Sequence, residues 1–373
     1  MKAYVLHNVS DIRLENIEIP TLKADEVLVE VKAVGICGSD IPRIYKTGAH
    51  IHPIVPGHEF SGIIVDCGDL ATEIYKNKCY GKDENNKSKE ENSKGKEKLI
   101  GKRVGVFPLI PCGNCIPCKK KKYEMCRNYN YLGSRCNGGF AEYVAVPVNN
   151  VIELPNEVSF EEAAMLEPMA VAVHAIRRSD IREDSKVVVC GLGTIGLLIV
   201  MFLKEFGIEN ILVIGNKDYQ KECVKKLGID DSCYYDNRDL EAKDWIFNNT
   251  DGNGVDIFFE CIGKNESISM AVDMMAPSGE IVFVGNPYSD ITFEKQVYWK
   301  ILRNQLKING SWNSSFTNEP DDDWHYVIER LKSGKISPSE FISHKYSMEG
   351  LIKGFEIMRD KSEDYVKIMG VFD

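Results

Sequence analysis

The sequence has no apolar run that approaches the ~20 residues needed to span a bilayer, and its most apolar stretch, 195–203, is short. It also has no excess of basic residues, because 46 Lys and Arg stand against 56 Asp and Glu and leave a net charge of −10. An acidic chain is poorly suited to bind a phosphate backbone, so we expect neither nucleic acid nor a membrane as partner. No apolar h-region of a signal peptide follows Lys2, so no secretory signal is indicated and a cytoplasmic protein is expected.

Core-forming residues are plentiful. The 373 residues are 43% hydrophobic and 27% charged, which is typical of a folded chain. At about 100–200 residues per domain, this length predicts two domains. Twelve cysteines are too few for a disulfide scaffold. In a reducing compartment, clustered cysteines favour a metal site, and scattered ones are small buried hydrophobic residues.

The expected secondary structure changes near residue 185. Before it, short alternating segments such as 27–36 predict a β-rich region. After it, apolar segments at 186–190, 211–215 and 255–263, expected as strands, alternate with helices. This α/β pattern predicts a doubly wound parallel sheet with helices on both faces. The alternation ends near residue 311.

Residues 76–98 have a different character, since they hold eight lysines and five acids but no Leu, Ile, Val, Phe or Met. Such a segment buries too little apolar area to offset its ordering entropy, so a surface loop insertion is predicted. A lysine-rich docking arm is the alternative.

The motif GLGTIG, residues 191–196, lies between an expected strand and an expected helix. Gly191 allows a tight turn, Gly193 lets the backbone approach a pyrophosphate, and Gly196 lets helix and strand pack closely. Thr194 and Ile195 open the helix, whose N-terminal N–H groups suit phosphates. A dinucleotide site is therefore predicted, with a glycine turn that binds no ligand as the alternative.

The end of the next strand bears on which dinucleotide binds. NAD sites place an acid there for the ribose 2′-OH, but this chain has Gly215, Asn216 and Lys217. Glycine leaves room for a 2′-phosphate, and the lysine can pair with it. Asp218 is predicted to be the N-cap of the following helix. NADP is favoured, with NAD as the alternative.

Four cysteines, Cys112, Cys115, Cys118 and Cys126, lie within 15 residues. Short loops of this spacing suit tetrahedral zinc, and four sulfur ligands leave no position for substrate, so a structural zinc is predicted. Disulfides and a zinc-ribbon nucleic-acid reader are the alternatives. Apart from these four and Cys37 in the motif GICGSD, the other seven cysteines are expected to be structural or inert.

A second zinc site needs mixed ligands and an open position. Cys37 in GICGSD and His58 and Glu59 in PGHEFSG follow strands in turn-rich sequence. Glu167 is unusual because it lies in an otherwise apolar stretch. Each of these is weak alone, but a thiolate, a neutral imidazole and the Glu167 carboxylate would balance Zn²⁺ and leave a fourth position for a substrate oxygen.

Six motifs occur in the order GICGSD, VPGHEFSG, the four-cysteine loop, GGFAEY, EPMAV and GLGTIG. Over nearly its whole length the chain resembles the zinc-containing medium-chain alcohol and polyol dehydrogenases. The resemblance implies a GroES-like catalytic domain over 1–168 and 312–373 and a Rossmann domain over 169–311. It also implies that Cys37, His58 and Glu167 bind the catalytic zinc, with Glu59 as an adjacent ligand or a supporting carboxylate.

The resemblance further implies reversible hydride transfer between NADP and a secondary alcohol, in a homodimer or homotetramer. Ser39 matches the family's proton-passing hydroxyl, although a turn serine would be ordinary there, and the relay histidine found in many relatives is replaced by Pro42. Some members of the fold family bind NADP without zinc chemistry.

Segments 41–50, 133–143 and 300–312 are similar to the subgroup that oxidises galactitol 1-phosphate. Arg43 and Arg135 are the candidate phosphate ligands, with His50 and Lys46 as weaker ones. Surface arginines that pair with local acids are the alternative, and an unphosphorylated polyol or diol, such as sorbitol or butanediol, is the alternative substrate.

Overall fold

The structure, a computed structural model, describes residues 1–80 (side chains to residue 78), 99–238, 242–287 and 289–373. The chain divides into two compact units, of which unit 1 comprises Met1–Glu167 and Ser315–Asp373 and unit 2 comprises Pro168–Ser314. Both chain ends thus contribute to unit 1. Within the described residues, no helix combines the length and the apolar character needed to cross a membrane.

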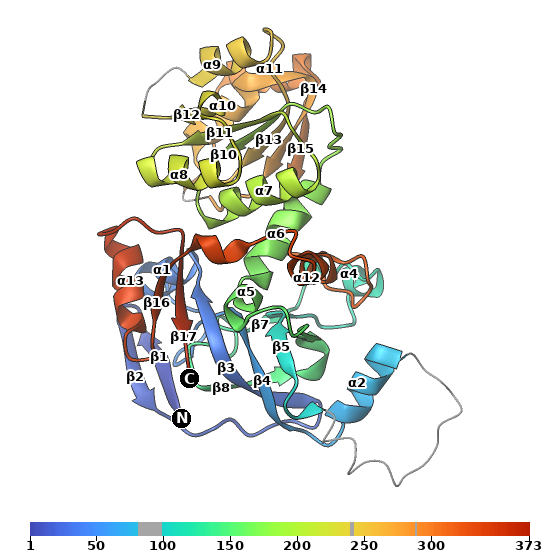
Figure 1. The fold of residues 1–373 in the computed structure, drawn as a ribbon, viewed down its shortest axis with the longest axis vertical. Coiled ribbons are helices and arrows are strands. Elements are labelled where there is room, and N and C mark those ends of the chain that lie inside the picture. Colours follow the sequence, from blue (N-terminus) through green and yellow to red (C-terminus); the bar gives the residue numbers. More distant parts are fainter. Residues whose placement is uncertain (81–98, 239–241, 288) are drawn as a thin grey trace. The chain divides into compact units, whose positions relative to one another are not determined.

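Unit 1 is rich in β-structure (Figure 1). Its strands are β1 (Lys2–Asn8), β2 (Asp11–Asn16), β3 (Glu26–Ile36), β4 (Glu59–Cys67), β5 (Arg103–Val106), β6 (Leu109–Ile110), β7 (Asn130–Tyr131), β8 (Tyr143–Pro147), β9 (Val151–Glu153), β16 (Ile342–Tyr346) and β17 (Lys367–Val371). Its helices are α1 (Asp40–Pro42), α2 (Ala71–Tyr80), α4 (Ile116–Lys119), α5 (Phe160–Ala164), α12 (Asp323–Lys332) and α13 (Leu351–Asp360), and a π-helical turn covers Arg43–Thr47.

Strand β3 is the centre of unit 1. It pairs with β4, β8 and β17 in a seven-stranded sheet of order β16-β17-β3-β4-β5-β9, with β8 added along β3. Valine and isoleucine fill β3, and nearly all of its residues are buried, as β-branched side chains pack well on a pleated surface. The C-terminal strand β17 therefore lies directly beside β3, and the end of the chain reaches the middle of the sheet.

Unit 2 is a doubly wound α/β sheet, as the alternating pattern predicts. Its strands are β10 (Val187–Cys190), β11 (Ile211–Gly215), β12 (Tyr234–Asp236), β13 (Val255–Glu260), β14 (Met275–Phe283) and β15 (Lys307–Gly310). Its helices are α7 (Thr194–Glu205), α8 (Asp218–Lys226), α9 (Ala242–Asn249), α10 (Asn265–Met274) and α11 (Lys295–Arg303), and α6 (Leu166–Arg177) starts with the last two residues of unit 1. All pairings are parallel, in the order β12-β11-β10-β13-β14-β15, which is the Rossmann order.

The helices cover both faces of this sheet, with α7 and α8 on one side and α9, α10 and α11 on the other (Figure 1). Gly207 and Gly228 follow α7 and α8 with φ of +82° and +77°, so both helices end at the expected glycine.

Two expectations need correction. Residues 76–80, expected as the start of the loop insertion, continue helix α2, and the rest of the insertion lies outside the described residues. Asp218 is the first helical residue of α8 rather than its N-cap, which is Lys217. The carboxylate of Asp218 pairs with Arg238 at 2.5 Å instead of capping the helix.

Candidate metal centres and dinucleotide site

Sheet pairing in unit 1 assembles the first candidate metal centre. Cys37 follows the end of β3, and His58 and Glu59 lie at the start of the antiparallel strand β4, where Glu59 pairs with Gly35. The ligand atoms of Cys37, His58 and Glu59 all lie within 4.8 Å of one another. A β-carbon at Gly35 would overlap the carboxylate of Glu59, so glycine there makes room for the acid.

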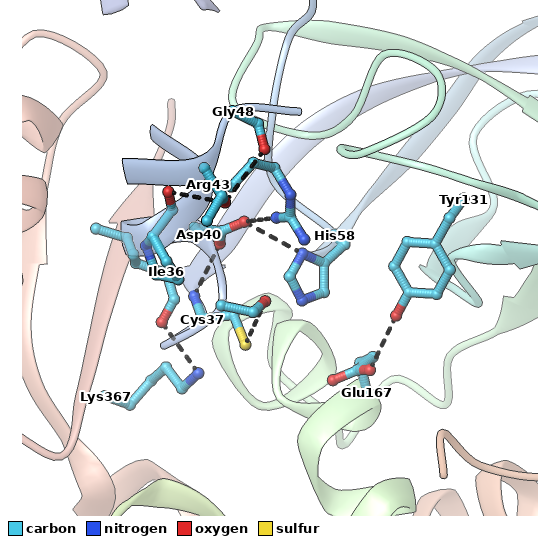
Figure 2. Close-up of polar contacts among 12 residues, drawn as sticks. Ile36, Cys37, Asp40, Arg43, Gly48, His58, Tyr131, Glu167 and Lys367 are labelled. Carbon is cyan, nitrogen blue, oxygen red and sulfur yellow. Dashed lines mark hydrogen bonds and ion pairs between the residues drawn. The ribbon is translucent and has the colours of Figure 1, made fainter. Parts of the chain in front are cut away.

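Asp40 contacts two residues of this group, Cys37 and His58 (Figure 2). It is fully buried, accepts a hydrogen bond from the backbone N–H of Cys37 at 3.0 Å, and lies 3.4 Å from Nδ1 of His58. Burial lowers the pKa of His58, but the charges of Asp40 and Cys37 outweigh it and hold that pKa well above its usual value. A carboxylate on one ring nitrogen leaves the other for a metal, which is the usual arrangement of a metal-bound histidine.

The carboxylate of Glu59 forms an ion pair with a buried lysine. Its Oε2 lies 2.5 Å from Nζ of Lys367 in β17, and these side chains are only 1% and 2% exposed. Lys367 also donates to the backbone carbonyl of Ile36 at 3.2 Å. The ion pair uses one carboxylate oxygen of Glu59, so Oε1 remains as the oxygen that can bind a metal.

Glu167 lies near these groups but outside the compact set that Cys37, His58 and Glu59 form. The hydroxyl of Tyr131 donates to its Oε1 at 3.3 Å, and the Tyr131 ring packs edge-on against His58 with centroids 5.7 Å apart (Figure 2). Burial, reinforced by the charge of Glu59, raises the pKa of Glu167 to about 7 despite the opposing charges of His58 and Lys367. The structure thus brings Glu59, rather than Glu167, into the compact donor set.

These residues fit a zinc ion that keeps an open position. A thiol, an imidazole and a carboxylate within 4.8 Å supply three ligand types that zinc accepts. Nδ1 of His58 is buried and lacks a hydrogen bond of good geometry, so the ring is held by charge and packing rather than committed elsewhere.

Two other predicted residues lie beside this centre. The hydroxyl of Ser39 donates to Sγ of Cys37 at 3.3 Å. Arg43 is not a free cation, because its guanidinium lies 2.5 Å from the buried Asp40 carboxylate. Arg43 thus pairs with a local acid, and phosphate binding by Arg43 stays a prediction.

Arg135 is placed differently. Its guanidinium lies over the ring of Tyr129, 4.8 Å from the centroid, and its Nε is buried with no hydrogen-bond partner. His50 is close enough that Arg135 and Arg43, added to burial, lower the pKa of its imidazole. The backbone N–H of His50 donates to Ser134 O at 3.3 Å, so the two predicted phosphate segments meet. Lys46 is exposed on the intervening turn.

The four clustered cysteines form the second candidate metal centre. The Sγ atoms of Cys112, Cys115, Cys118 and Cys126 lie within 4.8 Å of one another. The Sγ of Cys115 is 3.4 Å from that of Cys118 and 3.9 Å from that of Cys126. Sulfurs of a disulfide are about 2.05 Å apart, and none of these four cysteines forms one in the structure. The separations match the ~3.8 Å between sulfurs that Zn–S bonds of about 2.3 Å give in a tetrahedron.

Backbone N–H groups favour the thiolate form of one cysteine in this loop. Hydrogen bonds from the backbone of Arg127 and Cys118 lower the pKa of Cys115 to about 6, whereas burial raises the pKa of Cys118 to about 12. One sulfur is thus poised as a thiolate, the form that binds zinc. Apart from these four and Cys37, the six other cysteines with described side chains form no disulfide, and Cys79 lies outside the described side chains.

The glycine motif occupies the turn between β10 and α7 in unit 2. Gly191 has φ of +95°, and a β-carbon there would lie 2.6 Å from Ile262 Cγ1. A β-carbon at Gly196 would overlap the carbonyl of Gly191, whereas one at Gly193 would meet nothing within 4 Å. Gly193 therefore faces open space, and α7 begins at Thr194 with no side-chain cap on its N-terminal N–H groups. The N-terminal N–H groups of Thr194, Ile195 and Gly196 are of the kind that suits a pyrophosphate, as predicted from the motif.

The carboxyl end of β11 carries the residues predicted to choose the cofactor. Gly215 ends β11, the backbone N–H of Asn216 donates to Gln220 Oε1 at 2.9 Å, and Nζ of Lys217 lies 5.3 Å from the ring centroid of Tyr219. Arg238, just after the neighbouring strand β12, pairs with both Asp218 and Asp236. The carboxyl ends of β11 and β12 are thus followed by two cations and two acids: Lys217, Arg238, Asp218 and Asp236.

Sequence reasoning missed four residues of these sites: Asp40, Tyr131, Lys367 and Arg238. Asp40 stands in the motif GICGSD, where an acid in a turn reads as an ordinary cap. Lys367 and Tyr131 are far from Glu59 and Glu167 in the sequence, and no local pattern signals their contacts. Arg238 could have been found from its place after the strand next to β11.

Two protein-family models match this chain, and individual known proteins are similar to it over nearly its whole length. The alcohol dehydrogenase GroES-like domain matches residues 23–82 and 86–156, and the zinc-binding dehydrogenase domain matches residues 194–333. Galactitol 1-phosphate 5-dehydrogenase of Escherichia coli K12 is 30% identical over 94% of each chain, and sorbitol dehydrogenase of Bacillus subtilis is 29% identical over 99% of this chain and 96% of its own.

Solved structures are also similar to this chain. A crystal structure of galactitol-1-phosphate dehydrogenase from Escherichia coli has a TM-score of 0.85 at 29% identity and covers 100% of each chain. A Sinorhizobium meliloti protein crystallised with NADP has a TM-score of 0.83 at 25% identity and covers 99% of this chain and 98% of its own. The likeness to both structures extends over both units.

Proposed function

Since the chain belongs to the zinc-binding alcohol dehydrogenase family with a GroES-like domain, and is a dehydrogenase of the alcohol and polyol type, we propose that it transfers hydride between NADP(H) and a secondary hydroxyl of a phosphorylated sugar alcohol. Galactitol 1-phosphate represents this substrate class. The group formed by Cys37 with the buried His58 and Glu59, beside Asp40, carries the proposal. Unphosphorylated polyols and diols are the second candidate substrates.

In this proposal Cys37, His58 and Glu59 hold the catalytic zinc. When bound, zinc supplies Lewis acidity, which lowers the pKa of the substrate hydroxyl. Asp40 fixes the orientation of His58 and of the Cys37 backbone, and Lys367 fixes Glu59. Ser39, whose hydroxyl already contacts Cys37 Sγ, takes the first step of proton exit. Beyond Ser39 the relay ends at Pro42, so the proton leaves through water or cofactor hydroxyls.

Metal analysis combined with kinetics tests this function. We expect two zinc ions per chain and NADP-dependent oxidation of a polyol that stops when the zinc is removed by a chelator and returns when zinc is added back. One zinc per chain with no polyol oxidation would instead place the protein among the zinc-free, NADP-binding members of the fold.

Phosphate recognition depends on Arg135 in this proposal. Its Nε is buried without a partner, and His50 lies within its electrostatic influence. A charge-assisted contact from arginine contributes about 1.5–3 kcal/mol, or roughly 10–100-fold. We therefore expect kcat/KM for galactitol 1-phosphate to exceed the values for galactitol, sorbitol and 2,3-butanediol by that factor. Arg135→Ala is expected to remove this advantage and leave the free polyols unchanged.

Arg13→Ala is the matched control, because Arg13 is an exposed arginine of unit 1 that pairs with Asp11. It is expected to change none of the four values. Free polyols that react as well as the phosphate ester in the unmodified protein would contradict the phosphate site and favour a sorbitol- or butanediol-type enzyme.

Cofactor preference is proposed to depend on Lys217. A β-carbon at Gly215 would lie 2.8 Å from Tyr234 Oη and 2.9 Å from Gln220 Oε1, so Gly215→Asp would disturb the strand end and Lys217 is the cleaner position. Lys217→Glu replaces a cation by an anion and is expected to lower kcat/KM with NADP by more than about tenfold, with little change for NAD. Lys225→Glu, near the other end of α8, is the control. A preference of the unmodified protein for NAD would refute the assignment.

Self-association is proposed through one edge of unit 2. Tyr298, Trp299 and Leu302 of α11 are 55%, 45% and 50% exposed, and Ile308 of β15 is 41% exposed. Strand β15 ends the sheet of unit 2, with no described strand beyond it, and an apolar patch beside a free strand edge favours pairing with a second copy. Light scattering is expected to give at least twice the 42.1 kDa of one chain.

The patch itself is tested by substitution. Trp299→Glu is expected to shift the protein toward the monomer, whereas Ile19→Glu, at an exposed isoleucine of unit 1, is not. A monomeric unmodified protein would contradict the proposal.

A further inference from the structure

The segment that follows β12 lies against the strand end on which cofactor preference is proposed to depend. Strands β11 and β12 are parallel neighbours, with Gly215 opposite Asp236 (Figure 1). One residue further on, the backbone N–H of Asn237 donates to Gly215 O at 2.7 Å. Arg238 comes next in the chain, and Lys217 lies just past the end of β11. Both cations thus lie at the same end of the sheet.

The side chain of Arg238 connects two acids at this place. Its Nε donates to both carboxylate oxygens of Asp236 at 2.9 Å, and its Nη2 lies 2.5 Å from Oδ1 of Asp218, the first residue of α8. The backbone N–H of Arg238 also donates to Asp236 Oδ1 at 3.0 Å. The hydrogen bond from the guanidinium lowers the pKa of Asp236. One arginine therefore bridges the acid that ends β12 and the acid that begins α8.

The charges at this end of the sheet cancel because Arg238 is present. Two cations face two acids: Lys217, Arg238, Asp218 and Asp236. Lys221, one turn along α8, pairs with Asp231 at 3.5 Å and adds no net charge. Without the arginine, two neighbouring carboxylates would face one lysine. A 2′-phosphate, which carries about 1.5–2 negative charges at neutral pH, would be repelled by that excess of acid.

The same two acids are the ones available to an unphosphorylated ribose. A β-carbon at Gly215 would lie 2.8 Å from Tyr234 Oη, so an acid at the strand end itself would have to displace its neighbours. Asp218 and Asp236 remain as carboxylates that could accept a hydrogen bond from a ribose hydroxyl, which is how NAD sites use an acid. Arg238 engages both of them.

Building on the proposed function, we propose that Arg238 is a positioning residue that favours NADP over NAD by neutralising Asp218 and Asp236. Lys217 makes the contact with the 2′-phosphate, and Arg238 removes the opposing charge of the two acids around that contact. The guanidinium also holds both carboxylates away from the hydroxyls of an unphosphorylated ribose.

Arg238→Ala removes the cation and leaves both acids in place. We expect this variant to bind NADPH about tenfold more weakly, because one unit charge a few ångströms from a phosphate has an effect of this size in water, and to bind NADH within about twofold of the unmodified protein. The measurement is fluorescence titration of the full-length protein with each reduced nucleotide, without substrate. Adding Asp218→Asn to Arg238→Ala is expected to restore the affinity for NADPH, because the charges then cancel again.

Ionic strength separates an effect of charge from a change of shape. The Debye length falls from about 10 Å at 0.1 M salt to about 3 Å at 1 M. The difference in NADPH affinity between Arg238→Ala and the unmodified protein is therefore expected to shrink to less than about threefold at 1 M salt. Arg182→Ala is the matched control, since Arg182 is an exposed arginine of unit 2 that pairs with Asp184 at 3.7 Å. It is expected to change neither affinity.

Unchanged NADPH affinity in Arg238→Ala would overturn the inference. So would a loss that persists at 1 M salt and that Asp218→Asn does not restore, because the guanidinium would then bind the phosphate itself or shape the strand end. These titrations need no turnover. A protein that shows the expected pattern but oxidises no polyol would reject the proposed reaction and leave the role of Arg238 standing.

Discussion

Cys37→Ala is expected to lose at least about 1,000-fold in kcat while the protein keeps its fold and one zinc ion per chain. The thiolate is the only sulfur ligand of the candidate catalytic centre, and its loss leaves His58 and Glu59 as the compact donors. A Lewis acid at a reacting oxygen contributes several kcal/mol to transition-state stabilisation, and each 1.36 kcal/mol is a factor of ten. The measurements are zinc content by mass spectrometry and turnover under saturating substrate and cofactor.

The control for this prediction is Cys67→Ala. Cys67 is a buried cysteine that forms no disulfide, in the same strand as Glu59 but at its opposite end, so it tests the loss of a buried sulfur without the loss of a ligand. It is expected to keep two zinc ions and normal turnover. A Cys37→Ala protein that retains both zinc ions and full activity would refute the zinc mechanism.

Cys115→Ala is expected to act on stability rather than on chemistry. Three sulfurs cannot complete the closed tetrahedral shell that a structural zinc requires, and the loop from Cys112 to Cys126 contains only the short helix α4 and one 3-10 turn. Loss of a structural metal belongs to the few mechanisms that destabilise a protein strongly, so we expect a decrease of more than about 2 kcal/mol in unfolding free energy. Zinc content should fall to one ion per chain.

Calorimetry with and without a chelator separates this effect from a packing defect. In the unmodified protein the chelator is expected to lower the melting temperature, and in Cys115→Ala that part of the response should be absent. Turnover per catalytic zinc should remain close to normal at temperatures below the new transition. A Cys115→Ala protein with unchanged melting temperature and two zinc ions would mean that the loop holds no structural metal.

Local sequence determined much of this protein. Periodicity with turn glycines is sufficient to predict the Rossmann sheet, since each β-α unit is built from neighbouring residues and ends at a glycine such as Gly207. The four-cysteine loop is equally local, because its ligands lie within 15 residues. The resemblance added the GroES-like unit, which composition and alternation describe only as β-rich.

Only the tertiary structure decided how charge is distributed around the candidate catalytic centre. The pairing of β3 with β4 and β17 brings Lys367 against Glu59, 308 residues apart in sequence. Tertiary contacts also place Tyr131 against Glu167, whereas Arg43 pairs with Asp40, only three residues earlier in the chain. Sequence reasoning considered both carboxylates as ligands and both arginines as phosphate binders, because residue type alone sets what a side chain can bind. For Glu59 and Glu167 the partner depends on contacts between residues far apart in the sequence, which no local pattern encodes.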